Sequence, residues 1–106
     1  MMLTTTEQIV GKKIVQTLGV ARGNTIRARH IGKDILAALK TLVGGEIEEY
    51  TKLIAEAREQ AIDRMVDSAR EMGANAVVSV RFTTSYVMGT ASEILAYGTA
   101  VVVKPA

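Results

Sequence analysis

The sequence predicts a two-layer α+β domain of β-α-β-β order, in which an antiparallel sheet packs against one long helix. Apolar residues recur at steps of three and four over 46–72, which is the period of one helix face. Two extended stretches follow at 75–87 and 92–104. The chain has 106 residues with no linker or low-complexity segment, so we expect a single domain over 1–106.

The first third of the chain is predicted to be mostly extended. The "LTTT" stretch favours a short strand at most, and β-branched residues indicate a strand over 13–21 and a weaker extended piece over 25–29. The turn-prone "RGNT" lies between these two pieces. From 31 to 43 the apolar residues take helical spacing, and Gly44 and Gly45 can adopt the left-handed conformations that end a helix.

The long helix opens with three carboxylates, Glu46, Glu48 and Glu49. Carboxylates in a first helical turn interact favourably with the free N–H groups there, by about 0.3–1 kcal/mol each. A hard cation needs several converging oxygens, whereas Glu48 points away from the side that the other two share. We therefore interpret this cluster as a helix start, and Gly73 with Asn75 as the helix end.

The first of the two C-terminal strands alternates in polarity, and "MGTA" predicts the hairpin connection after it. One face of this strand is apolar and the other is polar. The apolar set is Ala76, Val78, Val80, Phe82 and Tyr86, and the polar set is Ser79, Arg81, Thr83 and Ser85.

The last strand is apolar on both faces, which is typical of a strand covered on both sides. The two sets are Leu95, Tyr97, Val101 and Val103, and Ile94, Ala96, Ala100 and Val102. One helix covers only one face of a sheet, and the chain has no second element of that size. We therefore predict a homo-oligomer in which a neighbouring subunit covers outward-facing Ile94, Ala100 and Val102.

Several motifs in fixed order resemble the YbjQ-like family of small bacterial and archaeal proteins. They are GGEI, YT, AR, RM, GANAVV and YGTA, together with the N-terminal "TT" and "GNTIRARHIGKDI". The resemblance covers nearly the whole chain. It implies a β-α-β-β subunit assembled into a homopentameric ring, and a function in heavy-metal binding.

The densest positive patch predicts an anion site formed by Arg27, Arg29 and His30. These residues precede a predicted helix start, whose free N–H groups also favour anions. A solvated basic loop is the alternative reading of the same residues. The net charge of +2 is too small and too scattered to indicate a nucleic-acid partner.

The residue types give no metal-binding or catalytic residues. The chain has no cysteine and one histidine, and its methionines do not cluster. No serine lies in a nucleophile motif and no glycine pattern indicates a nucleotide cofactor, so any cofactor stays undetermined.

We therefore expect a cytoplasmic oligomer that binds a small anion or a metal ion, with no membrane segment. Two alternatives stay open. One is an enzyme whose active site is assembled between subunits, and the other is a purely structural oligomer.

Overall fold

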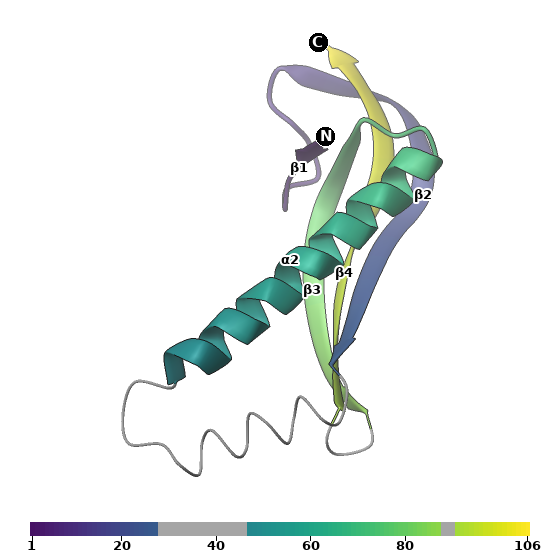
Figure 1. Cartoon of the computed structure of the whole chain (residues 1–106). Coiled ribbons are helices and arrows are strands. Elements are labelled where there is room, and N and C mark those ends of the chain that lie inside the picture. The colour runs from purple at the N-terminus through teal and green to yellow at the C-terminus, as the bar shows by residue number, and fades with distance from the viewer. Residues whose placement is uncertain (28–46, 88–90) are drawn as a thin grey trace.

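The computed structural model describes residues 1–27, 47–87 and 91–106 and has the predicted α+β class (Figure 1). Its elements are β1 (Met2–Leu3), β2 (Lys12–Arg27), α2 (Ile47–Glu71), β3 (Ala76–Val87) and β4 (Ala91–Pro105). The sheet order is β1-β3-β4-β2. Strands β2 and β3 both run antiparallel to β4, whereas β1 runs parallel to β3, so the sheet is mixed. The helix predicted over 31–43 lies outside the described residues.

Strand β2 is one continuous strand of 16 residues instead of the two pieces predicted. It pairs with β4 from Lys12 to Arg27, with two bulges before Val20. Gly23 does not make a turn. A Cβ at this position would meet the backbone of Met65 and Ala61, so glycine is required because the helix approaches the strand this closely.

Helix α2 ends in a Schellman motif, which confirms the predicted helix end. Gly73 has a φ of 90°, in the left-handed region that glycine adopts without strain. Its N–H donates to the carbonyl of Arg70 at 2.9 Å, and the N–H of Ala74 donates to Ala69 at 3.0 Å. Asn75 then joins the helix end to β4, because its side-chain amide both donates to and accepts from the backbone of Val103.

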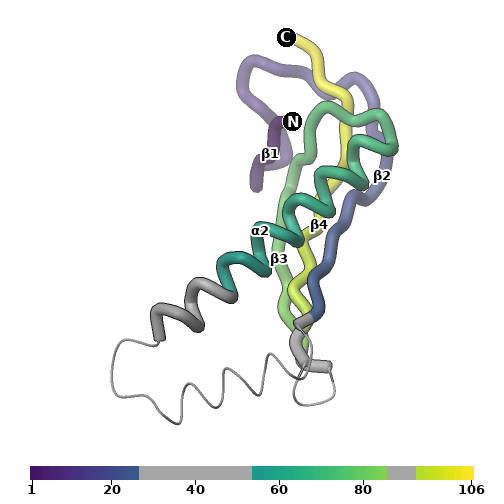
Figure 2. Tube along the Cα trace, in the orientation of Figure 1, coloured from purple at the N-terminus to yellow at the C-terminus, as the bar shows by residue number. Residues whose placement is uncertain are grey.

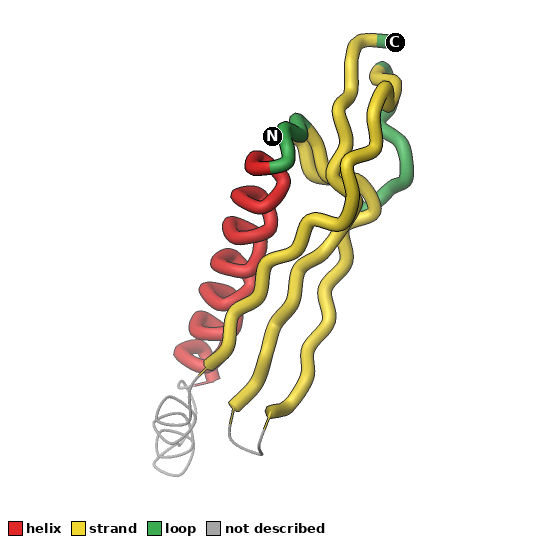
Figure 3. Tube along the Cα trace, turned by 90° about the vertical axis from the view of Figure 1, so that its right-hand side faces the viewer, coloured by secondary structure: helices red, strands yellow, loops and turns green. Residues whose placement is uncertain are grey.

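The main core lies between α2 and one face of the sheet, as the two layers in Figure 3 show. Small side chains dominate it, which allows the helix to lie close to the strands. Its members are Ala21, Ala57, Ala61, Met65, Ala69, Val77, Val80, Ile94, Ala96 and Ala100. The predicted outward orientation of Ile94, Ala100 and Val102 is therefore wrong. Ile94 and Ala100 are 4% and 0% exposed in the core under the helix, and Val102 lies on the same side because it alternates with Val101 and Val103 of the helix-free face.

A bulge in β3 also corrects the predicted alternation of that strand. Val78 pairs with Thr99, but the next pair is Arg81 with Tyr97, and Ser79 has a φ of 55°. Residues 79 and 80 of β3 lie opposite the single residue Gly98 of β4, and this one extra residue reverses which side chains face the helix. Ala76 and Val78 therefore lie on the helix-free face, whereas Val80 lies on the helix side.

Candidate functional site

The N-terminal segment covers one end of the helix-free face. Ile9 packs on a second, smaller core formed by Ala76, Val78, Val101 and Val103. Figure 2 shows this segment leaving β1 and looping back into β2 beside the C-terminal end of β4. The predicted short strand at "LTTT" corresponds to β1 and the residues after it.

The β3 bulge provides the attachment points for this segment. The N–H of Ser79 donates to the carbonyl of Thr6 and that of Val80 to Thr4, both at 2.9 Å. The guanidinium of Arg81 donates through Nη1 to the carbonyl of Thr5 at 2.8 Å. The segment is thus held to β3 by three hydrogen bonds within three consecutive residues, one of them charge-assisted.

The rest of the helix-free face is exposed, and we call it the open face. It includes large apolar side chains: Val20 is 64% exposed, Ile26 55% and Tyr97 37%. Polar groups lie among them, and Asn24 Nδ2 donates to Glu93 Oε2 at 3.1 Å. By strand register the open face comprises Val20, Arg22, Asn24, Ile26, Arg81, Thr83, Ser85, Glu93, Leu95, Tyr97 and Thr99.

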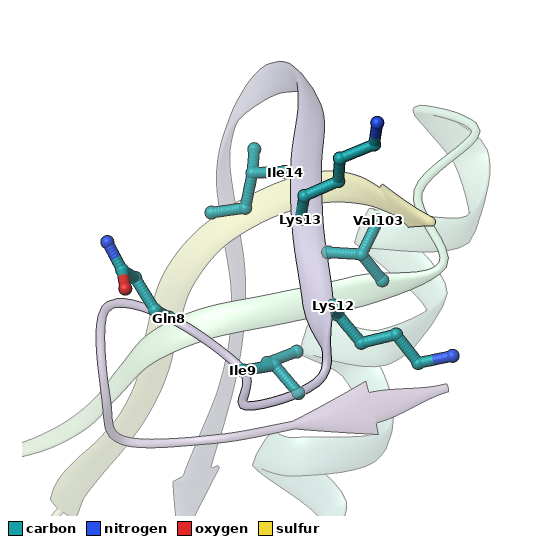
Figure 4. A pocket seen from close by; sticks show the side chains of 6 residues that line it. All are labelled: Gln8, Ile9, Lys12, Lys13, Ile14 and Val103. Atoms are coloured by element: carbon teal, nitrogen blue, oxygen red, sulfur yellow. The ribbon is translucent and has the colours of Figure 1, made fainter. Parts of the chain in front are cut away.

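A hollow of about 310 Å³ lies where the N-terminal segment meets the start of β2 (Figure 4). Apolar side chains and three polar ones line it: Gln8, Ile9, Lys12, Lys13, Ile14 and Val103. Figure 4 shows the ammonium groups of Lys12 and Lys13 extending to the side opposite Gln8. The sequence alone did not indicate these residues, because a Lys-Lys pair forms part of a site only once the N-terminal segment has folded beside it.

The residues of the predicted anion site are mostly outside the described structure. Arg27 is the last residue of β2, and Arg29 and His30 lie beyond it, outside the described residues. Of the acidic cluster, Glu46 also lies outside. The helix begins at Ile47, so Glu48 and Glu49 belong to its first turn, as the helix-start interpretation requires.

Comparison with known proteins assigns the family. A model of the YbjQ family, described as "Putative heavy-metal-binding", matches residues 1–104. The chain belongs to the YbjQ family. A UPF0145 protein of Dehalococcoides mccartyi is 62% identical over 104 residues, covering 98% of this chain and all of that one. A UPF0145 protein of Methanosarcina acetivorans is 61% identical over 101 residues, covering 95% of each chain.

A solved structure supports the fold. The crystal structure of a DUF74 family protein with unknown function from Pediococcus pentosaceus superposes with a TM-score of 0.64. The match covers 98% of each chain at 16% identity, so it bears on the architecture alone. No helix within the described residues is long and apolar enough to cross a membrane.

The donor groups of this YbjQ family member do not fit a soft heavy metal. Such metals favour thiolate ligands, and the chain has no cysteine and a single histidine, His30. Over residues 1–27, 47–87 and 91–106, no three His, Asp or Glu side chains are grouped as metal ligands would be. The family's description therefore has no matching ligand set in the described part of the chain.

Proposed function

We propose that this YbjQ family member is a self-assembling protein that binds a small anionic ligand, with its open face covered by another copy of the chain. The observation that carries the proposal is the unequal covering of the sheet. One face lies under α2, whereas the other exposes Val20, Ile26 and Tyr97 over much of its area. A sheet with an exposed apolar face is stabilised when a second layer removes that face from water.

A second copy fits this surface because the open face carries both signs of charge. Arg22 and Arg81 lie on it together with Glu93, so it can form ion pairs of both signs with a different surface of a neighbouring copy. Strand β2 is also an edge strand of the described sheet, with β4 as its neighbour. Edge strands favour pairing with a further chain, and head-to-tail contacts that close produce a ring. The resemblance to the YbjQ family implies five copies.

The assembly is tested by charging the open face. Val20→Asp with Ile26→Asp should convert the oligomer to a folded monomer, because both side chains are more than half exposed in the single chain. Val10→Asp makes the same chemical change at a fully exposed residue outside the open face and should leave the mass unchanged. Light scattering gives the mass and circular dichroism the fold. A wild-type monomer at micromolar concentration, or an unchanged mass for the double variant, contradicts the proposal.

The ligand in this proposal is an anion bound by Arg27, Arg29 and His30. Three neighbouring groups, two of them always cationic, are suited to a phosphate or carboxylate. Arg27 ends β2, so a ring that aligns β2 from each copy repeats this positive end around the assembly. Such a repeat strengthens the field beyond that of one subunit.

The proposal excludes a tightly bound heavy metal as the resident ligand. The purified protein, after dialysis, should contain less than one zinc, copper or cadmium ion per chain by elemental analysis, because it has no thiolate ligand. A variant with His30→Ala is the control, since it removes the only imidazole. Stoichiometric metal in the wild type that is lost in this variant contradicts the proposal.

A further inference from the structure

We propose a second ligand site, in the hollow between the N-terminal segment and the start of β2, that takes a small anion carrying an apolar part. It goes beyond the assembly and the Arg27 site proposed above, because it lies at the opposite end of β2 and within one chain. The two features that point to it are the shape and lining of the hollow and the lysines beside it, which form no ion pair among the described residues.

The lining combines an apolar floor with polar groups at its rim. Ile9, Ile14 and Val103 supply the apolar surface, and Figure 4 shows them on three different backbone segments. Val103 is 7% exposed and Ile14 is 39% exposed, so the apolar floor is buried on the β4 side and open to solvent on the β2 side. At about 310 Å³ the hollow is at the lower end of the range of ligand pockets, which suits a ligand of a few carbon atoms.

The positive charge comes from three lysines at this end of the sheet. Lys12 and Lys13 line the hollow, and Lys104 is the direct cross-strand neighbour of Lys13. Like charges opposite each other in an antiparallel pair repel. Because successive strand residues alternate, Lys13 and Lys104 lie on one face of their strands, and Lys12 is the lysine on the same face as Ile14 and Val103.

No acidic side chain compensates these lysines within the described part of the chain. The ion pair found there joins Arg70 to Asp67 on α2, at 3.7 Å. Glu7, which precedes Gln8 in the N-terminal segment, is exposed and forms no ion pair in this region. A carboxylate or phosphate supplied by a ligand would thus act as the ion-pair partner of these ammonium groups, while the amide of Gln8 lies on the opposite side of the hollow.

The ligand class follows from the two features together. An anion without an apolar part would leave the floor formed by Ile9 and Ile14 in water, and an apolar molecule without charge would leave the lysines unpaired. A short-chain carboxylate satisfies both, because its alkyl part buries apolar surface while its head group reaches the ammonium groups.

The test compares hexanoate with acetate and with hexanol by titration calorimetry and by amide chemical shifts. Hexanoate should bind more tightly than either, and the shifts should concentrate on residues 8–14 and 103. Lys12→Gln with Lys13→Gln should weaken hexanoate binding at least about tenfold, as expected for lost charge-assisted hydrogen bonds. Arg58→Gln with Arg70→Gln removes two exposed positive charges from α2 and should not change hexanoate binding.

A third variant tests the apolar floor. Ile14→Ser should weaken hexanoate binding and leave acetate binding unchanged, and the partial exposure of Ile14 allows the fold to persist. Equal affinity of the wild type and the double lysine variant, no preference for hexanoate over acetate, or no binding at millimolar concentration overturns the site.

Light scattering on the same samples separates this site from the proposed assembly. A change of mass in the lysine variant without a change in hexanoate affinity would show that the hollow is a contact between copies and would also overturn the site. Loss of the oligomer with hexanoate binding intact would contradict the assembly alone.

Discussion

The two faces of the sheet are built from the same strands but differ in what covers them. Toward α2 many of the side chains are small and fully buried, such as Ala21, Ala61 and Ala100. On the open face larger side chains, including Val20 and Ile26, remain more than half exposed. The close approach of the helix limits the size of the side chains on one face, whereas the other face retains apolar area that the single chain does not bury.

The largest expected effect is a loss of stability when carbon atoms are added to β2 at the point where helix α2 lies closest. Gly23→Val should destabilise the fold by about 3 kcal/mol, because a Cβ there meets helix backbone that has no freedom to move aside. Val20→Leu adds one carbon atom to the same strand on the open face and should change stability by less than about 0.5 kcal/mol. Urea unfolding measures both, and equal losses would contradict the difference between the faces.

A smaller effect tests how the covered part of the helix-free face is held. Arg81→Met removes the hydrogen bond to the carbonyl of Thr5 while keeping a side chain of similar length. The free energy of locally opening the N-terminal segment should then fall by about 1 kcal/mol. Amide hydrogen exchange should accelerate at Ser79 and Val80, whose N–H groups donate to this segment.

An amide at the C-terminal end of the helix is the control for this variant. The amide of Ala74 should keep its exchange rate, because its hydrogen bond is to the carbonyl of Ala69 in the helix and not to the N-terminal segment. Uniform acceleration at all three amides would mean global destabilisation and would refute a local role for Arg81.

The contrast between the faces also explains which parts of the fold the sequence predicted. The period of the long helix, its end at Gly73 and the two apolar faces of β4 are local patterns, and the structure confirms them. Which face of β4 the helix covers depends on tertiary packing and not on the local pattern of the strand. The prediction that Ile94 and Ala100 face outward was wrong for this reason.

Two further corrections come from residues whose local signal competes with a long-range contact. Gly23 lies in a stretch whose composition indicates a turn. Its lack of a side chain instead allows the helix backbone at Ala61 and Met65 to pack closely on β2. Ser79 occupies one more polar position in the predicted alternating strand, yet it lies in the gap of the β3–β4 register and its N–H donates to the carbonyl of Thr6. Neither partner is adjacent in sequence. The hollow at Lys12 was missed likewise, because Gln8 and Val103 meet only in the folded chain.

The smallest expected effect is the rise in melting temperature with phosphate, which distinguishes the two ends of β2. One end carries Lys12 and Lys13 at the hollow, and the other end leads from Arg27 into Arg29 and His30. Inorganic phosphate lacks an apolar part, so it should favour the second end, where three cationic or hydrogen-bonding groups follow closely in sequence. Phosphate should therefore raise the melting temperature by a few degrees, as ligands specific to the folded state do, and Arg27→Gln with Arg29→Gln should reduce that gain.

Lys12→Gln with Lys13→Gln is the matched control, since it removes the same two charges from the other end of the strand. It should keep most of the phosphate effect while losing hexanoate binding, and the arginine variant should show the reverse. Sulfate at equal ionic strength tests for general salt stabilisation, which would raise the melting temperature of all three proteins by the same amount. Equal gains with phosphate in the wild type and both variants would mean that β2 has no anion preference at either end, and the Arg27 site would be withdrawn.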